Sequence, residues 1–409
     1  MRILWVKAGR ILPVDSGGRI RSYNLARQLL TRHDFTFLSY YDGATDRIYE
    51  DELRTAFPGA VAISTGVPTG GMLSQGMRYV RHAANAAPYA VTKFAYRPVA
   101  QMIAEWDARE RFDVMICDFL SASLNVPRTL RTPTVLFQHN VESALWSRQA
   151  AHEQNPLRRL VFSNEARKMA RYERQAVKQF HHVIAVSEHD RGLMSEMTSG
   201  EHISVVPTGV DLSLYRTAAG TAASDQVVTF LGSMDWDANV DGVAWFCETI
   251  WPRVVAAVPG AKFRIVGRNP DARIKVLASD SIDVVGRVPS VIEYLKETAV
   301  FVVPLRVGGG TRLKIFEAMA AGRAVVSTRV GAEGLSVTHG DDVILEDEPE
   351  AFARAVISLL RNADERRALE QSAAKTAARY DWSEIVLSFE IAMELARVEA
   401  RRDMVGAAN

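Results

Sequence analysis

Short apolar stretches alternate along the chain with longer stretches whose apolar residues recur at helical spacing. In the first half, the apolar stretches lie at residues 3–6, 35–39, 61–64, 114–117, 134–137 and 183–186. Helical spacing occupies residues 19–30, 98–109 and 156–180. Several apolar stretches are continuous, which is typical of strands covered on both faces. The alternation therefore predicts βαβ units around a parallel sheet.

The second half repeats this pattern. Apolar stretches lie at residues 227–231, 263–266, 282–285, 299–303 and 324–327, and helical spacing at residues 240–257, 290–295, 312–321 and 351–361. Residues 216–225 have few large apolar side chains, so we expect a linker there. We predict an α/β fold with two doubly wound, Rossmann-like parallel-sheet domains, at residues 1–200 and 201–380, facing each other across a cleft. Residues 381–409 include a long helix that can return to either domain, and we expect it on the N-terminal one.

Composition narrows the class of protein. The chain has 409 residues, of which 48% are hydrophobic and 24% are charged, so we expect a folded rather than a disordered protein. Its two cysteines, Cys117 and Cys247, exclude a disulfide scaffold or a cysteine-rich zinc site. The apolar runs are far shorter than the roughly 18–20 residues of a membrane span, and the N-terminus lacks the layout of a signal peptide. We therefore expect a reduced, cytoplasmic enzyme.

The net charge of +1 conceals an asymmetry between the two halves of the chain. Residues 1–200 carry 26 Lys and Arg against 19 Asp and Glu, whereas the rest of the chain carries 23 against 29. The near balance argues against a nucleic-acid-binding protein. The basic half suggests a partner different from that of the acidic half, although drift in surface composition gives the same counts.

The strongest chemical signal lies where an apolar strand at residues 299–303 gives way to three glycines and a helix. The glycines, Gly308–Gly310, let a ligand approach the backbone N–H groups closely, and Thr311 can cap the helix or contact a phosphate. The helix N-terminus favours anions, and Arg312 and Lys314 add formal positive charge there. A plain strand-to-helix turn explains three glycines and two cations less well, so we predict a phosphate site. The spacing excludes a Walker-type loop.

Three further positions carry candidate chemistry. Glu317 lies three residues after Lys314 on an otherwise apolar stretch. It either forms a structural pair with that lysine or accepts hydrogen bonds from vicinal hydroxyls such as those of a ribose. Gly17 and Gly18 follow the first strand and hold a phosphate or an acceptor, or only make a turn. His139 ends another strand, where side chains of parallel sheets reach a ligand, although a lone histidine is often structural.

Motifs spread over the chain resemble a known family. They are Gly17–Gly18, His139–Asn140, Ser187 in A-V-S-E, V-V-P-T-G-V-D at residues 205–211, and F-E-A-M-A-A-G-R-A-V-V-S-T at residues 316–328. In this order they resemble the group 1 retaining glycosyltransferases, the GT4 family with the GT-B fold, over essentially the whole chain. Residues 232–245 also resemble a bacterial polysaccharide-associated subgroup.

The resemblance implies a hexosyltransferase that requires neither a metal nor another cofactor. It would move a sugar from a nucleotide diphosphate sugar, with a UDP- or GDP-linked donor most expected, and retain the anomeric configuration. The C-terminal domain would bind the nucleotide and the N-terminal domain the acceptor. By resemblance, Glu317 binds the ribose hydroxyls, and Arg287 and Val288 lie where the backbone meets the base. His139 corresponds to the histidine at the donor sugar, and Gly17–Gly18 to the loop beside the diphosphate.

Two departures from the family's motifs change the expected site. The first glutamate of the Glu-x7-Glu motif is replaced by Gly309, which favours same-face attack over a double displacement through a carboxylate. The Arg and Lys that brace the diphosphate in the first loops of the C-terminal domain are replaced by Ser233 and Asn239. We therefore expect other cations to bind the diphosphate: Arg312, Lys314 and, as a weaker candidate, Arg268.

No motif specifies the acceptor, and the resemblance suits a glycan, a lipid-linked or a small-molecule acceptor. The helix expected at residues 156–180 carries seven Lys and Arg against two Asp and Glu. This excess suits peripheral binding to an anionic membrane, at the inner face of the cell membrane, or simply a solvated helix face. The alternatives to a transferase are a non-catalytic sugar-nucleotide-binding subunit or sensor and a GT-B nucleotide-sugar epimerase. The sequence makes no prediction of the oligomeric state.

Overall fold

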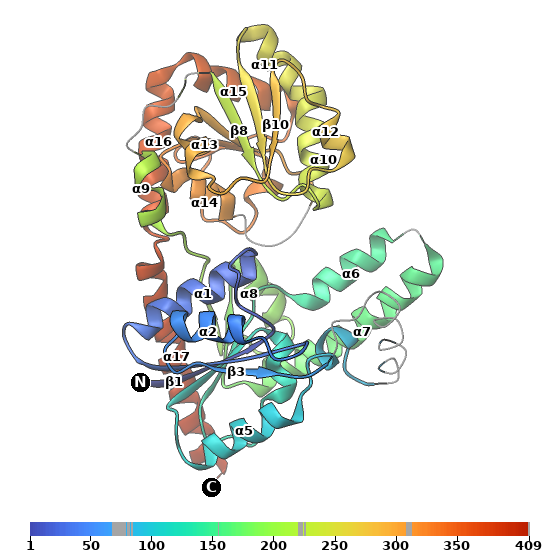
Figure 1. Ribbon diagram of the computed structural model, residues 1–409, viewed down its shortest axis with the longest axis vertical. Coiled ribbons are helices and arrows are strands. Elements are labelled where there is room, and N and C mark those ends of the chain that lie inside the picture. The colour runs from blue at the N-terminus through green and yellow to red at the C-terminus, as the bar shows by residue number, and fades with distance from the viewer. Residues whose placement is uncertain are drawn as a thin grey trace. The chain divides into compact units, whose positions relative to one another are not determined.

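The computed structural model describes residues 1–67, 79, 82, 85–153, 155–219, 224, 226–307 and 313–407 (Figure 1). The chain divides into two compact units. The N-terminal unit comprises Met1–Pro207 together with Ile385–Asn409, and the C-terminal unit comprises Thr208–Glu384. Each unit contains its own parallel sheet.

The described residues of the N-terminal unit form a seven-stranded parallel sheet in the order β3-β2-β1-β4-β5-β6-β7. The strands are β1 (Arg2–Ala8), β2 (Asp34–Tyr41), β3 (Val61–Ser64), β4 (Val114–Asp118), β5 (Thr134–Phe137), β6 (His182–Ala185) and β7 (Ile203–Val205). Every residue of β4, β5 and β6 is buried, so both faces of the sheet are covered at its centre. The register sets Lys7 of β1 beside Asp118 of β4.

Helices connect these strands. They are α1 (Gly17–Leu30), α2 (Arg47–Ala56), α4 (Tyr89–Thr92), α5 (Arg97–Ala108), α6 (Glu142–His152), α7 (Pro156–Gln179) and α8 (Glu188–Ser195). A buried carboxylate joins two of them, because Glu173 of α7 accepts hydrogen bonds from the backbone N–H groups of Glu142 and Ser143 at 2.8 and 2.9 Å. Glu173 thereby caps the N-terminus of α6 with negative charge.

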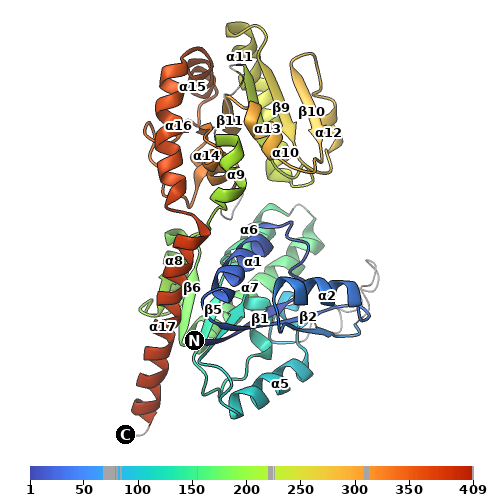
Figure 2. The ribbon, with the colours of Figure 1, turned by 60° about the vertical axis from the view of Figure 1, so that its left-hand side comes forward.

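The C-terminal helix α17 (Trp382–Ala407) packs on the N-terminal unit from Ile385 onward, alongside β5 and β6 (Figure 2). Phe389 stacks on Trp5 of β1 with ring centroids 5.6 Å apart and meets Phe137 of β5 edge-on at 5.2 Å. At the helix surface, Glu390 accepts from Arg32 at 2.6 Å and lies 2.8 Å from His33. Aromatic packing therefore holds one face of α17 against the sheet.

The described residues of the C-terminal unit form a six-stranded parallel sheet in the order β10-β9-β8-β11-β12-β13. The strands are β8 (Val227–Leu231), β9 (Lys262–Val266), β10 (Ile282–Gly286), β11 (Val300–Val303), β12 (Ala324–Ser327) and β13 (Ile344–Leu345). The α-helices are α9 (Leu212–Ala219), α10 (Asp237–Trp245), α11 (Trp251–Ala257), α12 (Ala272–Lys275), α13 (Ile292–Glu297), α14 (Leu313–Ala320), α15 (Pro349–Arg361) and α16 (Ala363–Ala378).

These two units confirm the predicted fold class, an α/β chain with two Rossmann-like parallel sheets. The linker expected at residues 216–225 was wrong over its first part, because residues 212–219 form helix α9. The helix forms because Tyr215 and Ala218, three residues apart, lie on one face of it and pack into the core of the C-terminal unit. Among the described residues, no helix is long and apolar enough to cross a membrane, and no group of three or more metal-ligating side chains is found.

Candidate active site

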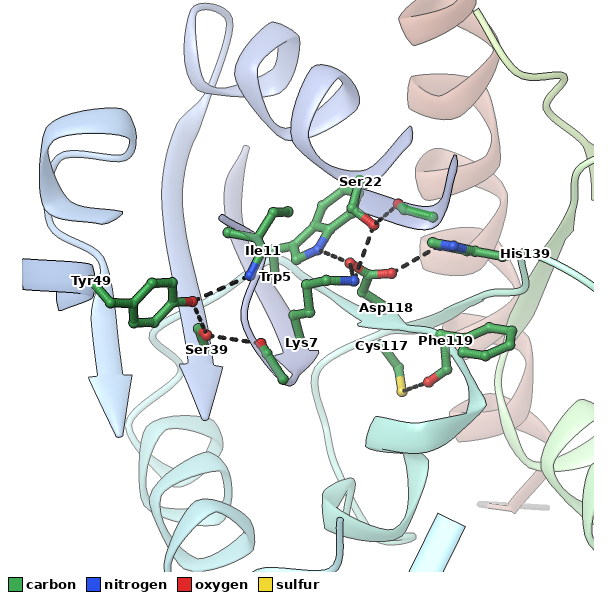
Figure 3. A network of polar contacts seen from close by, with 12 residues as sticks. Trp5, Lys7, Ile11, Ser22, Ser39, Tyr49, Cys117, Asp118, Phe119 and His139 are labelled. Atoms are coloured by element: carbon green, nitrogen blue, oxygen red, sulfur yellow. Dashed lines mark hydrogen bonds and ion pairs between the residues drawn. The ribbon is translucent and has the colours of Figure 1, made fainter. Parts of the chain in front are cut away.

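The carboxyl ends of β1 and β4 hold a buried charge network centred on Asp118 (Figure 3). The carboxylate oxygen Oδ2 accepts from Lys7 Nζ and from Trp5 Nε1, each at 2.9 Å. The other oxygen, Oδ1, lies 2.9 Å from His139 Nε2, in a direction that departs from an ideal N–H···O hydrogen bond. The Lys7 ammonium, the Trp5 indole N–H and the His139 ring therefore converge on one carboxylate, which has almost no contact with solvent.

This burial sets the ionisation of the network. Burial alone would raise the pKa of Asp118, but Lys7 and His139 outweigh it and hold that pKa well below its usual range. Burial lowers the pKa of His139 to about 4, although Asp118 acts in the opposite direction. At neutral pH the pair is therefore a carboxylate beside a neutral imidazole. Asp118 fixes the position of His139 rather than keeping it charged.

The structure brings His139 together with the glycine loop that follows β1. A methyl group placed on Gly18 would lie 3.0 Å from His139 Nδ1, so the absence of a side chain permits this approach. The carbonyl of Gly18 accepts from Ser22 Oγ at 2.9 Å, and Ser22 Oγ lies 3.2 Å from Lys7 Nζ. The loop, the histidine and the Asp118 network are thus one connected structure. Gly17 starts α1, and no atom lies within 4 Å of the methyl group that an alanine there would carry.

A second buried cation lies on α1. Arg21 is almost completely buried, and burial lowers its pKa to about 10, against the opposing influence of Asp190 and Asp118. Asp190 belongs to the first turn of α8, whose N-cap is Ser187. Ser187 Oγ accepts from the backbone N–H of Asp190 at 3.1 Å. Ser187, quoted above for its motif, therefore has a capping role.

In the C-terminal unit, Lys314 of α14 reaches the loop that follows β8. Its Nζ donates to Asn239 Oδ1 at 3.0 Å and lies 4.3 Å from the centre of the Phe230 ring. A methyl group on Gly232 would lie 2.7 Å from Lys314 Nζ, so this glycine also permits a close approach. Asn239 in turn donates to the backbone carbonyl of Ser233 at 2.8 Å.

Arg268 contacts the same loop from the end of β9. Its Nε donates to Ser233 Oγ at 2.9 Å and lies 3.9 Å from a carboxylate oxygen of Asp235. Lys314 and Arg268 therefore lie at one segment, the loop of residues 232–236 with the first turn of α10, although they are far apart in the sequence. We call this set, with Ser233 and Asn239, the β8-loop cluster.

Glu317 lies one helical turn after Lys314 on α14 and is partly buried. Burial raises the pKa of Glu317, while a hydrogen bond from Tyr215 of α9 and the charge of Lys314 act to lower it. Tyr215 itself is buried, and burial together with the carboxylate raises the pKa of its phenol. Tyr215 therefore orients Glu317 through its hydroxyl group.

The remaining sequence-predicted residues are less constrained by contacts. Arg287 is exposed directly after β10, and Val288 is partly buried against the core of the C-terminal unit. Five predicted residues lie outside the described part of the chain: Gly308, Gly309, Gly310, Thr311 and Arg312. The structure therefore brings together Gly18 with His139 in one unit, and Ser233, Arg268 and Lys314 in the other.

Sequence reasoning missed three side chains of these sites: Lys7, Asp118 and Tyr215. Lys7 is a charged residue directly after the apolar residues 3–6 of β1, and Asp118 ends β4. A buried charge needs a partner, so the two signals together would have predicted the pair. Tyr215 lay in the segment next to the expected linker, which hid its role.

Two family models match the chain. The model described as Glycosyltransferase Family 4 matches residues 16–214, and the model described as Glycosyl transferases group 1 matches residues 225–362. Together they cover both units, except for β1 with its Lys7 and the segments outside these ranges. The matched segments include Gly17, Gly18 and His139 in the first case and Lys314 and Glu317 in the second.

Individual relatives agree with these models. The chain is 28% identical over 210 residues to the phosphatidyl-myo-inositol mannosyltransferase of Mycolicibacterium smegmatis, covering 49% of this chain and 53% of that protein. It is 26% identical over 145 residues to an uncharacterized 44.6 kDa protein in the cps region of Klebsiella pneumoniae, covering 33% of this chain and 37% of that protein. The chain thus spans about half, or less, of the length of these curated relatives.

Solved structures share the fold over nearly the whole chain. The structure of Anabaena HepE in complex with UDP and glucose has a TM-score of 0.63 at 15% identity, covering 96% of this chain and 99% of that one. The structure of S. aureus TarM with UDP, fondaparinux and α-GlcNAc-glycerol has a TM-score of 0.64 at 12% identity, covering 96% and 100%. At such identities the likeness establishes the fold. With both family models matched and this fold observed, the chain belongs to the group 1, GT4-like glycosyltransferases of the GT-B fold.

Proposed function

We propose that the protein transfers a hexose from a nucleotide diphosphate sugar to an acceptor hydroxyl, with retention of the anomeric configuration. The observation that carries the proposal is the pairing of functions on α14. Lys314 at one turn reaches the β8-loop cluster, and Glu317 at the next is a carboxylate oriented by Tyr215. A cation beside a carboxylate one helical turn away suits a diphosphate joined to a ribose.

The chemistry asked of these residues is mainly electrostatic. When the bond between the anomeric carbon and the diphosphate oxygen breaks, negative charge develops on the leaving diphosphate. Lys314 and Arg268, with Arg312 as a further cation, stabilise that charge without a metal ion, because preorganised donors act most strongly where charge develops. The nucleotide therefore belongs to the C-terminal unit in this proposal.

Retention follows in our proposal from attack on the same face that the diphosphate leaves. The acceptor oxygen bonds to the anomeric carbon, and its proton passes to the departing diphosphate oxygen. The neutral imidazole of His139, fixed by Asp118, hydrogen-bonds the donor sugar near the reacting carbon. Gly17 and Gly18 lie beside the diphosphate, and Arg287 and Val288 contact the base. The acceptor binds to the N-terminal unit.

The acceptor is proposed to be a glycan or a lipid-linked molecule, and the enzyme to act in the cytoplasm. Support for a lipid-linked acceptor comes from α7, whose first turns expose Leu157 and Leu160 on either side of Arg158 and Arg159. Apolar and basic side chains together suit the surface of an anionic membrane. Salt-sensitive co-sedimentation with vesicles of anionic phospholipid is expected, and its absence would contradict peripheral membrane binding.

Turnover of donors tests the proposal as a whole. The chain is incubated with UDP-, GDP- and dTDP-sugars, with and without candidate acceptors and with a metal chelator present, and release of the nucleoside diphosphate is measured. UDP-glucose and GDP-mannose come first, because HepE is described with UDP and glucose and the mycobacterial relative as a mannosyltransferase. The anomeric configuration of the product is read by NMR.

Each outcome assigns a function. Acceptor-dependent release of the nucleoside diphosphate with a retained anomer supports the proposal. Loss of this release in the presence of the chelator would contradict the proposed metal independence. Binding without turnover of every donor would identify a sensor or partner subunit instead. Interconversion of the donor sugar without an acceptor would identify an epimerase.

A further inference from the structure

Helix α17 presents a continuous apolar stripe on the side opposite its packed face. Leu387, Ile391, Leu395 and Val398 are 40%, 62%, 39% and 43% exposed, whereas the aromatic and small residues of the other face are buried. Single exposed apolar residues are ordinary, but four in one line on one helix are not. We therefore expect another surface to cover the stripe.

The stripe ends in opposite charges. At 3.6 residues per turn, successive residues are separated by about 100°, which places all four apolar positions within about 40° of the direction of Ile391. The same rotation places Glu384 and Arg402 about 20° from that line, before and after the apolar positions. Both charged residues are exposed. Within about 40° of Ile391, the outer face thus carries an acid, four apolar residues and a base in order along the helix, and Glu394, which is paired with Arg397 at 2.8 Å, lies at the edge of the stripe.

This order is complementary to itself when reversed. If a second α17 lies antiparallel, with the two-fold axis passing near residue 393, Glu384 of one copy meets Arg402 of the other. Leu387 then meets Val398, and Ile391 meets Leu395. A two-fold contact requires such a self-complementary surface. A parallel arrangement would instead set Glu384 against Glu384 and Arg402 against Arg402.

The surface beside the stripe has room for partner side chains. A hollow of about 530 Å³ is lined by Met1, His33, Leu387, Glu390, Ile391, Glu394, Leu395 and Val398. Its acidic wall is already neutralised in part, because Glu390 is bound to Arg32 and lies beside His33. An aliphatic side chain from a facing helix can therefore enter it as a knob enters a hole.

We propose that two copies of the chain associate through an antiparallel α17–α17 contact about this stripe. The occupant is a second copy rather than a lipid surface, because one end of the stripe is acidic. An interfacial membrane helix carries basic residues along its flanks, whereas an acid at one end and a base at the other match only an inverted partner.

A charge exchange tests both the contact and its direction. The full-length chain is studied by sedimentation velocity over a range of concentrations. Glu384→Arg sets two arginines against each other at each end and is expected to raise the dissociation constant at least about tenfold, and Arg402→Glu likewise with two glutamates. The double variant, Glu384→Arg with Arg402→Glu, restores opposite charges across an antiparallel contact and is expected to recover the wild-type constant.

Further variants keep the proposal falsifiable. Ile391→Glu places a charge in the stripe and is expected to give monomers, whereas Glu196→Gln, outside α17, leaves the association unchanged. Circular dichroism confirms that each variant folds. A wild-type chain that stays monomeric at all concentrations would overturn the proposal, as would a dimer insensitive to Ile391→Glu or a double variant no better than the single ones. Monomers that bind anionic vesicles through α17, with binding lost in Ile391→Glu, would also overturn it.

Discussion

The first six strands of each unit follow the same order, but the two units distribute charge differently at the ends of their central strands. In the N-terminal unit, Lys7 and Asp118 lie side by side inside the sheet and neutralise each other, and the carboxylate also fixes His139. In the C-terminal unit, the central strands end in apolar residues, and the cations come from outside the strands. Arg268 follows β9, and Lys314 of helix α14 contacts an amide oxygen and an aromatic ring. The first arrangement fixes geometry, whereas the second presents positive charge.

The difference teaches where each unit's chemistry resides. A buried ion pair contributes little net stability but makes the loss of either partner expensive, so the N-terminal network rigidly positions a neutral histidine. A lysine held by an amide oxygen and a ring keeps its field available for an incoming anion. We therefore expect variants of the first unit to act on folding and positioning, and variants of the second to act on binding of the nucleotide.

The largest expected effect comes from Asp118→Asn. The change leaves the buried Lys7 ammonium without a counter-charge, so the free energy of unfolding should fall by about 3–5 kcal/mol in urea titrations. Adding Lys7→Met removes the stranded charge and should recover part of the loss. Asp51→Asn, in an exposed ion pair with Arg54, is the matched control and should change little. Equal effects of Asp118→Asn and Asp51→Asn would mean that the network does not stabilise the N-terminal unit.

The second effect is on the nucleotide. Lys314→Met removes a charge-assisted contact worth about 1.5–3 kcal/mol, so UDP or GDP should bind roughly 10–100-fold more weakly in calorimetric titrations. Thermal stability should change much less than in Asp118→Asn. Lys275→Met, at the exposed end of α12 in the same unit, serves as the control. An unchanged affinity of Lys314→Met for UDP and GDP would mean that other cations bind the phosphates.

Most of the fold could be predicted from the sequence because its strands are buried on both faces. A run of apolar, β-branched or small residues such as 134–137 or 324–327 identifies its strand to the residue. The short edge strands β7 and β13 carry only three and two residues, too few to form such a run. Helix α9 was missed because its second half, residues 216–219, has no large apolar side chain and so resembles a linker. The residues that it places in the core, Tyr215 and Ala218, are too few to show a helical pattern.

The site was predictable only where its residues are close in sequence. Lys314 and Glu317 share one helical turn, so their association follows from spacing alone. Lys7 and Asp118 are separated by 111 residues and meet only because β1 pairs with β4. The same holds for Lys314 and Asn239, which are 75 residues apart. A single sequence does not specify which strand ends become neighbours, so these contacts required the structure.

A smaller effect is expected from Tyr215→Phe, which deletes the hydrogen bond to Glu317. That bond favours the ionised carboxylate, so its loss raises the pKa of Glu317 further above its usual value. If the carboxylate accepts the ribose hydroxyls, affinity for UDP is lost as the pH falls through this pKa. The variant should lose it at a higher pH than the wild type.

Two measurements separate this effect from general destabilisation. The ratio of affinities for UDP and 2′-deoxy-UDP should fall in Tyr215→Phe by roughly the five- to tenfold that one hydrogen bond provides. Tyr294→Phe, on α13 of the same unit, should leave the ratio unchanged. A constant ratio in both variants, with an unshifted pH profile, would separate Tyr215 from ribose recognition.

The smallest expected effect returns to the N-terminal unit, at Gly18→Ala. The added methyl group would lie 3.0 Å from His139 Nδ1, so the imidazole must move by a few tenths of an ångström. Alanine is favoured over glycine within a helix by up to about 1 kcal/mol, which offsets the crowding, so the free energy of unfolding should hardly change. Turnover should nevertheless fall severalfold, because His139 is displaced from the place at the donor sugar that we propose for it. Gly192→Ala, in α8 with no atom within 4 Å of the added methyl group, gives the same helical gain without the displacement. If both variants turn over alike, the distance between Gly18 and His139 is not part of the catalytic geometry, and the rigid positioning ascribed to the N-terminal unit ends at Asp118.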